Sequence, residues 1–570
     1  NKYINNNYKM IKKLYLTFFK ENKVYFIIYL LTLLYIPINR LYIPKYYGDF
    51  ISSLQKKNFD QTKIIFIYLI LGWLFIQILN IVSSYILQIL KPRFKKYVRQ
   101  FLFNEIYTRY KNDYQELKLG EIITKFIKTP YILEDVIYII KDYLIKNILI
   151  IISITGYLFY YNLKLGLLFL IFMIIIILLT IRYFNSSGKY YKFIDQQFDY
   201  THEEIEDTLS NLLSIYSARK GSFEKKRISR LDQNILMNDQ KLNKCRNKYR
   251  VVYTIIFFIT ICVLNYYSYI IFLNNELNLS TLISVIIMNY SLLDIFMSLY
   301  YETNDFIYSY VNINLVIEYI TKSLPKKIKQ SKTKIPNKYE KGIHIKFENV
   351  SYKYKDSQKY SLIDINFEIK PLENIIIMGH VGSGKSTLSK LLIRLLSNYQ
   401  GNILINGISN NKININNLRY NIVYIPQHPN LFNRTLKENL IYGVDTNKYS
   451  IEIMLNKLEE VGLGDIKTHF KNVMDKKVGK LGSKLSGGQR QIVWILRSLF
   501  SESKMVILDE PTSSMDLKTK EKIIKLIKEL SLDRNLIIIT HDKKLLEDNI
   551  HNRLIIFKNS KIDKIIKNMK

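Results

Sequence analysis

The sequence predicts two domains, an α-helical transmembrane domain of six helices followed by a soluble α/β domain. A chain of 570 residues is too long for one compact core. Apolar runs crowd residues 24 to 300, whereas the sequence after about Ser323 has the mixed polarity of a soluble protein. Within that second part, a short apolar strand leads into a glycine-rich loop and a helix, as at the start of a parallel α/β sheet.

Six segments are apolar over about the length that a helix needs to cross a bilayer, roughly 20 residues. One such run alone would also fit a buried helix of a soluble protein, but six in succession favour a membrane domain. No cleavage-site pattern of small residues follows the first run, so we expect it to be a retained span. The six spans are expected at about Val24–Ile43, Ile64–Leu90, Leu144–Tyr161, Leu165–Tyr183, Val251–Leu273 and Leu279–Tyr300.

The connections between these spans differ in charge, and the difference predicts their orientation. Basic clusters such as Lys91–Lys96 and Lys225–Arg227 lie in the long connections after the second and fourth spans. The connection after the fifth span, Asn274–Asn278, has no basic residue. By the positive-inside rule, we expect a multi-pass protein whose two termini and two long loops are cytoplasmic. The first outer connection, which contains Lys56 and Lys57, fits this rule less well.

Charge and cysteine content exclude two other classes of protein. The formal net charge of +35 would suit a nucleic-acid partner. However, Lys and Arg are spread through the chain among Asn, Ile and Tyr, so we predict no nucleic-acid binding. The two cysteines, Cys245 and Cys262, provide neither a disulfide framework nor metal-ligand spacing.

The domain boundaries follow from a change in composition. Between Thr321 and Lys341 the sequence turns polar and basic and contains Pro325 and Pro336, as expected of a linker. We therefore predict a transmembrane domain at residues 1–322 with long cytoplasmic loops, a linker at 323–342 and a soluble domain at 343–570.

A phosphate-binding loop is predicted directly after the apolar strand Ile375–Met378. Its glycines allow backbone N–H groups to surround phosphate oxygens, and the following helix adds the positive end of its dipole. We expect the Lys385 ammonium to reach the β- and γ-phosphates of ATP and the Ser386 hydroxyl to bind Mg²⁺. The predicted nucleotide-binding residues here are Gly379, His380, Val381, Gly382, Ser383, Gly384, Lys385, Ser386 and Thr387.

Two adjacent carboxylates end a second apolar strand, Met505–Leu508. In a chain with a phosphate loop, such a pair suggests divided roles. We expect Asp509 to hold Mg²⁺ through water and Glu510 to orient and deprotonate the attacking water. An acidic turn before Pro511 would be the simpler interpretation of the pair alone.

The segment Leu485-Ser486-Gly487-Gly488-Gln489 lies between these two motifs. With it the chain resembles the ABC transporters, whose signature sequence is LSGGQ. The resemblance implies a P-loop NTPase domain of the ABC type that hydrolyses ATP. It also implies that Ser486, Gly487, Gly488 and Gln489 contact ATP bound to the partner chain.

Further residues take their expected roles from the same resemblance. Gln427 resembles the glutamine that senses Mg²⁺ and faces the membrane domain, and His541 resembles the switch histidine that contacts the γ-phosphate. Asp516 lies in a segment that resembles the D-loop. Tyr354 resembles the aromatic residue that stacks on adenine, with Tyr352 as the runner-up. The resemblance thus implies Glu510, His541 and Gln427 as catalytic residues and Ser386, Gln427 and Asp509 as metal ligands.

Two positions depart from the family pattern. Lys480 precedes the signature where exporters usually have a glutamate, which puts in doubt how the ATPase domain communicates with the loops of the membrane domain. Leu372 occupies the turn before the phosphate-loop strand, where glycine is usual.

The resemblance implies an exporter-type half-transporter that alternates access across the membrane by binding and hydrolysing ATP. Because each ATP-site motif is present once, two chains are needed, and a homodimer is the simplest assembly. Membrane lipid surrounds the membrane domain, and the expected substrate is a small molecule, a lipid or a peptide that the sequence does not identify. The rival interpretations are a non-transport ABC ATPase, which would have no spans, and an importer component, whose membrane subunit is usually a separate chain.

Overall fold

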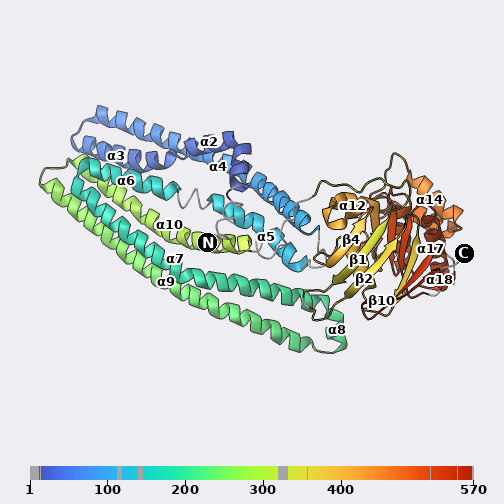
Figure 1. Cartoon of the computed structure of the whole chain (residues 1–570). Helices are drawn as coiled ribbons and strands as arrows, with labels where there is room; N and C mark the ends of the chain where they lie inside the picture. Colours follow the sequence, from blue (N-terminus) through green and yellow to red (C-terminus); the bar gives the residue numbers. More distant parts are fainter. Residues whose placement is uncertain are drawn as a thin grey trace. The chain divides into compact units, whose positions relative to one another are not determined.

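The structure is a computed structural model. It describes residues 12, 14–111, 119–138, 145–318, 331–355, 357–513, 515–542, 544–547 and 550–567. The chain divides into two compact units, a helical unit that ends with α10 and a second unit that contains all the described strands (Figure 1).

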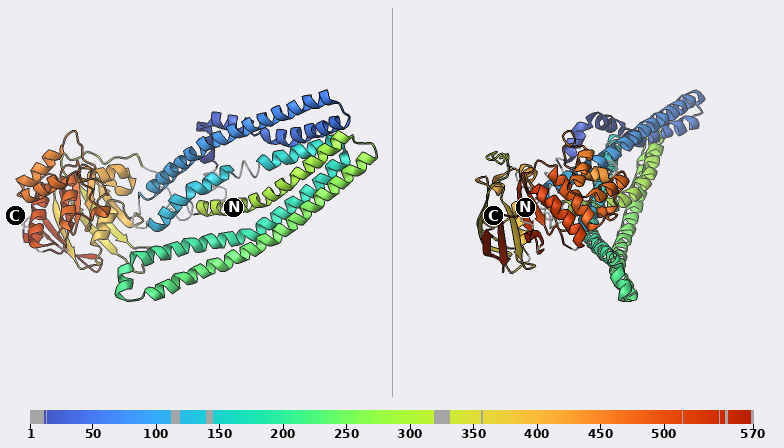
Figure 2. Two further views of the ribbon diagram at one scale, coloured as in Figure 1. Left: turned by 180° about the vertical axis from the view of Figure 1, so that it is seen from behind. Right: turned by 90° about the vertical axis from the view of Figure 1, so that its right-hand side faces the viewer.

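Long antiparallel helices make up the first unit. Two of them, α7 and α9, run side by side and are joined through the short α8, as all views show (Figure 2). The helices are α2 (Lys23–Thr32), α3 (Tyr35–Gln55), α4 (Phe59–Arg109), α5 (Leu119–Tyr138), α6 (Lys146–Tyr161), α7 (Leu163–Ser210), α8 (Leu212–Ser217), α9 (Gly221–Leu273) and α10 (Leu279–Glu318).

Helices run through all six predicted spans as far as these are described. By length and composition, four stretches of the described helices could cross a membrane: Lys23–Gln55, Phe59–Arg109, Leu163–Ser210 and Gly221–Leu273. The apolar helix Lys146–Tyr161 and the apolar part Leu279–Tyr290 of α10 are shorter. Large apolar side chains on the long helices point outwards, for example Leu71 and Trp73, which are 57% and 53% exposed. Such a surface is stable in lipid and not in water.

One stretch able to cross a membrane, Lys23–Gln55, covers the first predicted span, but it has a local break at Leu33 and Leu34 that separates α2 from α3. Pro37 explains the break. Proline has no N–H to donate to the carbonyl four residues earlier, and its ring collides with that carbonyl. Here the carbonyl belongs to Leu33, and it accepts instead from the Ile36 N–H at 3.0 Å.

Two sheets form the framework of the second unit (Figure 1). The antiparallel sheet has the order β2-β1-β4-β5, and the larger sheet has the order β10-β9-β3-β8-β7-β6, in which β3, β8, β7 and β6 are parallel. The strands are β1 (Ile345–Tyr352), β2 (Leu362–Ile369), β3 (Asn374–Gly379), β4 (Gln400–Ile405), β5 (Ile408–Ser409), β6 (Ile422–Ile425), β7 (Met505–Asp509), β8 (Asn535–Ile539), β9 (Arg553–Lys558) and β10 (Lys561–Lys567).

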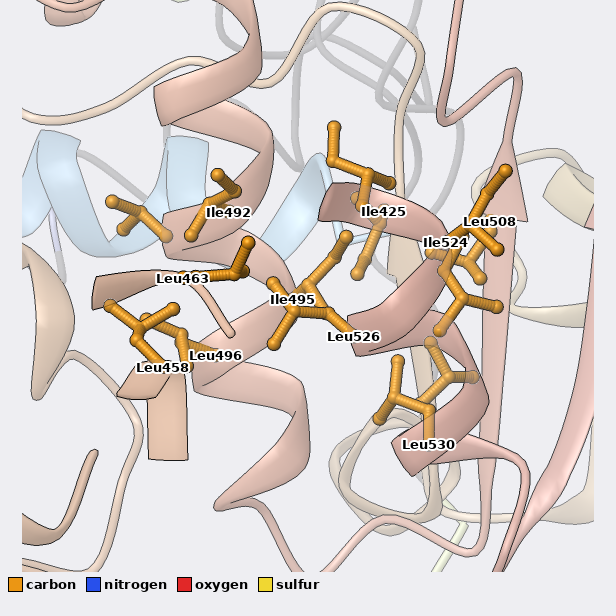
Figure 3. Close-up of a cluster of buried hydrophobic side chains, with 14 of the residues drawn as sticks. Ile425, Leu458, Leu463, Ile492, Ile495, Leu496, Leu508, Ile524, Leu526 and Leu530 are labelled. Carbon is orange, nitrogen blue, oxygen red and sulfur yellow. The ribbon is translucent and has the colours of Figure 1, made fainter. Parts of the chain in front are cut away.

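Helices pack against these sheets through buried aliphatic side chains. Figure 3 shows one such cluster, in which Ile495, Leu526 and Leu508 come from α16, α17 and β7. All three are fully buried, so they hold the two helices firmly on the sheet. The helices are α11 (Lys385–Leu392), α12 (Ile415–Asn421), α13 (Leu436–Leu440), α14 (Ile451–Glu460), α15 (Gly464–Val473), α16 (Gly487–Leu499), α17 (Leu517–Leu530) and α18 (Lys544–Glu547).

The described part of the predicted linker is bonded to the second unit. The Ile335 N–H donates to Asn417 Oδ1 at 2.8 Å, and the Asn406 side-chain amide donates to the Pro336 carbonyl at 2.9 Å. Residues from 331 onwards are therefore an ordered part of this unit's surface.

Candidate functional site

The predicted site residues converge because of the sheet topology. Strands β3, β8, β7 and β6 are parallel neighbours, so their carboxyl ends lie along one edge of the sheet. In open α/β sheets, ligands bind at this edge. The phosphate loop follows β3, Asp509 ends β7, His541 follows β8, and Gln427 lies shortly after β6.

Glycine is required where the phosphate loop enters α11. Gly384 is the N-cap of α11 and has φ +100°, a conformation that other residues rarely adopt. A Cβ atom at this position would collide with the carbonyl oxygen of Ser361. No side chain caps α11, so its first N–H groups are available to an anion.

Lys385 is folded back onto the loop that precedes it. Its ammonium donates to the carbonyls of Gly379 and His380 at 2.7 and 2.9 Å. Burial lowers the pKa of Lys385, although the nearby carboxylates of Glu510 and Asp509 oppose this shift. The side chain thus ties both ends of the loop together and keeps a cation beside the open N-terminus of α11.

Asp509 is held by two hydroxyl groups from different elements. The Ser386 hydroxyl donates to Asp509 Oδ1 at 3.0 Å, and the Tyr424 hydroxyl donates to Oδ2 at 2.7 Å. Burial raises the pKa of Tyr424, as does the neighbouring carboxylate, so this hydroxyl keeps its proton and remains a donor. Both oxygens of Asp509 are therefore fixed in direction.

Glu510 occupies a constrained position beside Asp509. Its backbone has φ +48°, unusual for a residue other than glycine, and its N–H donates to the Ile539 carbonyl at 2.8 Å. The carboxylate lies 3.3 Å from His541 Nε2. Burial raises the pKa of Glu510, while His541 and Lys385 act in the opposite direction. The Glu510 carboxylate thus lies next to the predicted switch histidine, His541.

One cleft of about 560 Å³ joins these residues. Gln427 lies at its margin, with its side-chain amide 3.4 Å from Ser513 Oγ. The predicted catalytic residues and metal ligands all line the cleft. Its lining consists of Val381, Gly382, Lys385, Ser386, Gln427, Asp509, Glu510, Thr512, Ser513, Lys520, His541 and Asp542.

The signature residues do not line this cleft. Ser486 is the N-cap of α16, where its hydroxyl accepts from the Gln489 N–H at 3.2 Å and Gln489 Oε1 accepts from the Ser486 N–H at 2.9 Å. Gly488 packs so closely against Thr519 of α17 that a Cβ atom would collide with it. Asp516 accepts from the N–H and the hydroxyl of the same Thr519. The signature and Asp516 therefore form a second group, linked through Thr519.

Tyr354 is placed next to the phosphate loop. Its hydroxyl lies 3.2 Å from Thr387 Oγ1, and its ring packs edge-on against Tyr352 at 5.0 Å between centroids. Tyr352 is only 8% exposed and belongs to the core. Of the two tyrosines, Tyr354 is thus the more accessible to a base bound beside the loop.

Some residues that line the cleft or bond its lining residues were not predicted. Tyr424 was not assigned a role, although it lies three residues before Gln427 on β6. Asp542 accepts from the Thr512 hydroxyl at 3.0 Å and from the Lys520 ammonium at 2.9 Å. Asp542 could have been identified because it is a polar residue directly after His541, which follows β8. Nothing in the local sequence pattern distinguishes Lys520.

The two departures from the family pattern have different structural outcomes. Leu372 takes φ +60° in the turn before β3, so it adopts the left-handed conformation that glycine usually fills. Lys480 is exposed and is followed by Leu481, whose φ is also positive at +56°.

Comparisons with known proteins agree with this arrangement. The family model for the ABC transporter matches residues 362–513, and that for the ABC transporter transmembrane region matches residues 26–294. A protein of Rickettsia prowazekii named as an export ATP-binding/permease protein is 23% identical over 94% of this chain and 91% of its own length. An ATP-dependent lipid A-core flippase of Haemophilus influenzae is 33% identical, but over only 36% of this chain and 35% of its own length. The solved structure of a bacterial Atm1-family ABC exporter with ATP bound covers 96% of this chain and 95% of that protein, with a TM-score of 0.84 at 16% identity.

Proposed function

The chain belongs to the ABC transporters, with the membrane domain and ATPase domain of an exporter-type half-transporter, and from this premise we propose that two copies form an ATP-driven exporter. It is an integral membrane protein and a transport ATPase. The observation that carries the proposal is the single cleft that collects Lys385, Glu510 and His541 at the carboxyl edge of the sheet.

ATP binds in this cleft with its phosphates on the loop between β3 and α11. The open N-terminus of α11 and the Lys385 ammonium supply the positive charge for them. Tyr354 stacks on the adenine. The hydroxyl of Ser386, the carboxylate of Asp509 and the amide oxygen of Gln427 are hard oxygen donors, as Mg²⁺ requires. When bound there, Mg²⁺ neutralises charge that develops on the phosphate oxygens.

Glu510 is the general base for hydrolysis. Its constrained backbone directs the carboxylate into the cleft, where it can accept a proton from the attacking water. His541 lies beside it at 3.3 Å and is placed to contact the γ-phosphate. Gln427, which also lines the cleft, would orient the same water and help to hold Mg²⁺.

Two chains complete each ATP site. Ser486 and its neighbours lie outside the cleft of their own chain, so they are free to cover ATP on a partner. Asp516 supports the same surface through Thr519. Two identical chains arranged head to tail give two equivalent sites, because each chain has one complete set of motifs.

ATP binding closes the two ATPase domains, and this closure shifts the membrane domains from inward-facing to outward-facing. Each state is populated according to its relative affinity for nucleotide, so hydrolysis returns the protein to the inward-facing state. The ATPase domain and both termini lie in the cytoplasm, in agreement with the basic loops. Substrates enter between the helices of the two membrane domains.

Replacement of Glu510 by Gln tests the proposed base. We expect Glu510→Gln to bind ATP normally but to reduce ATP turnover at least about a hundredfold, as expected for loss of a positioned general base. The matched control is Glu452→Gln, which changes an exposed carboxylate on α14. Turnover and ATP binding are measured on the purified chain in nanodiscs. Hydrolysis by Glu510→Gln at near the wild-type rate would show that another residue is the base.

A mixture of two inactive variants tests the shared site. Lys385→Ala removes the phosphate-loop cation, and Ser486→Arg blocks the signature. A dimer with one chain of each kind contains one wild-type site, so we expect the mixture to regain part of the ATP binding that each variant lacks alone. The control is a chain that carries both changes. If that doubly changed chain binds and hydrolyses ATP normally, the shared site is wrong.

A further inference from the structure

An apolar groove lies at the corner where the helical residues 14–21 turn into α2. It has a volume of about 650 Å³, in the range of sites that bind small organic ligands. Its lining includes Leu16, Phe19, Phe26 and Leu30. This groove belongs to the helical unit and is separate from the ATP cleft.

The groove has a fixed shape because one side of the corner is anchored. The rings of Tyr15 and Phe18 pack on Phe94 of α4, at 5.2 and 4.9 Å between centroids. The Tyr15 hydroxyl also donates to the Leu133 carbonyl of α5 at 2.7 Å. Anchoring of this face leaves the opposite face, with Leu16 and Phe19, directed into the groove.

The bend itself brings apolar groups of both helices together. The Asn22 side-chain amide donates to the Phe18 carbonyl at 3.0 Å and so ends the first helical segment. Phe19 and Phe26 then meet edge to face at 4.1 Å across the corner. Leu30, one turn further along α2, is 53% exposed and extends the apolar floor.

Two lysines also line this groove. Lys20 and Lys23 line it from either side of the bend, and neither forms an ion pair with a carboxylate in the described part of the chain. A third cation, Arg93 of α4, lies near the corner, with its guanidinium 5.0 Å from the Tyr25 ring and 3.5 Å from Asn22 Oδ1. The groove thus combines an apolar floor with positive charge at one end.

We propose that this groove binds an anionic phospholipid of the surrounding membrane. The acyl chain lies against Leu16, Phe26 and Leu30, and the phosphate is held by Lys20 and Lys23. The predicted first span begins at Val24, so these lysines lie at the level of the lipid headgroups, where lysine side chains commonly extend their ammonium groups. A soluble ligand would need more polar partners than this lining offers.

The proposal is independent of the transport cycle and is tested by lipid binding. The full chain is purified in a neutral detergent and stripped of lipid. Phosphatidylglycerol or phosphatidylcholine with the same acyl chains is then added, and bound lipid is counted by native mass spectrometry. The two lipids share a phosphate, but only phosphatidylglycerol has a net negative charge. We expect the wild-type chain to retain phosphatidylglycerol in preference.

Two variants separate the headgroup from the acyl chain. Lys20→Gln with Lys23→Gln removes both charges, so we expect the affinity for phosphatidylglycerol to fall about thirtyfold while that for phosphatidylcholine stays unchanged. The matched control is Lys56→Gln with Lys57→Gln, an exposed pair on the connection between α3 and α4. Leu30→Trp fills the groove and should lower retention of both lipids.

Three results would overturn the proposal. The first is a wild-type chain that does not distinguish the two lipids. The second is phosphatidylglycerol binding by the Lys20 and Lys23 variant that equals the wild type, which would leave only unselective surface lipid. The third is unchanged lipid retention by Leu30→Trp, which would place the acyl chain elsewhere.

Discussion

Two helix N-termini in the ATPase domain are both expected to face phosphate, yet they are built differently. The first residue of α11 follows Gly384, and no side chain caps this end. The N-terminus of α16 is closed by a capping box in which Ser486 and Gln489 bond each other's backbone N–H groups. The first backbone N–H groups of α11 therefore have no side-chain partner, whereas at α16 the chain's own side chains accept from N–H groups at the start of the helix.

The difference matches the proposed roles of the two ends. The α11 end belongs to a cleft that one chain forms alone, so its N–H groups can remain directed at a ligand. We propose that the α16 end contacts ATP on another chain, and in the structure its own side chains cap it. The proposed contact between ATP and Ser486 would therefore use the hydroxyl proton or require the capping box to open.

Of the substitutions that test this difference between α11 and α16, a side chain at Gly384 should have the largest effect. We expect Gly384→Ala to abolish binding of a fluorescent ATP analogue and to lower the melting temperature of the domain, because the Cβ collides with Ser361 in a strained backbone conformation. The matched control is Gly443→Ala, which also has positive φ but open space around it. Equal losses in both variants would mean that backbone strain alone, and not the shape of the loop, is responsible.

Removal of the Tyr424 hydroxyl should have an intermediate effect, on the Mg²⁺ dependence of ATP binding in the cleft beside α11. Asp509 would keep its bond from Ser386 on α11 but lose the donor on Oδ2. Because a hydrogen bond to a charged group contributes about 1.5–3 kcal/mol, we expect Tyr424→Phe to need at least about tenfold more Mg²⁺ for ATP binding. This is measured by titrating Mg²⁺ against bound nucleotide analogue in the Glu510→Gln background.

The control for this prediction is Tyr399→Phe, which removes a hydroxyl bonded to Asn410 at 2.6 Å outside the cleft. It should leave the Mg²⁺ dependence unchanged. If Tyr424→Phe also leaves it unchanged, Ser386 alone suffices to hold Asp509.

Loss of the capping box should have the smallest effect. We expect Ser486→Ala to lower the stability of the ATPase domain by about 1 kcal/mol, as measured by denaturant unfolding. Thr435→Ala on α13 is the matched control, because Thr435 and Glu438 form a second capping box away from the cleft. Both variants should lose similar stability, but only Ser486→Ala should slow ATP turnover. If Ser486→Ala and Thr435→Ala hydrolyse ATP at similar rates, Ser486 does not contact the nucleotide.

Local patterns predicted the motifs of the ATPase domain and the strands that carry them. The expected strands Ile375–Met378 and Met505–Leu508 lie within β3 and β7, because continuous apolar runs are typical of buried parallel strands. The contact between Tyr424 and Asp509 could not be predicted, since it depends on β6 and β7 being neighbours across 85 residues of sequence. The role of Thr519 depends likewise on the packing of α16 against α17.

The membrane domain was predicted more coarsely for a related reason. The length of an apolar run locates a span, but it does not show where one helical hydrogen bond is lost. The local break before Pro37 was therefore not predicted. The predicted sixth span ends at Tyr300, where apolar character falls, but α10, which contains it, continues to Glu318, and the sequence analysis did not predict that extension. Propensity and packing extend a helix beyond the membrane without leaving an apolar signal.

The length of the paired helices α7 and α9 has a mechanical consequence. With 48 and 53 residues, they are about 72 and 80 Å long, more than twice the roughly 30 Å of a bilayer's hydrocarbon core. About 40 Å of α7 and about 50 Å of α9 therefore exceed the thickness of the hydrocarbon core, so at least about 40 Å of each helix extends beyond it as a stiff arm. A tilt of about 5° at the membrane moves the far end of such an arm by about 3.5 Å. A small change in the tilt of α7 and α9 within the membrane therefore moves α8, at their far end, by about one atomic diameter.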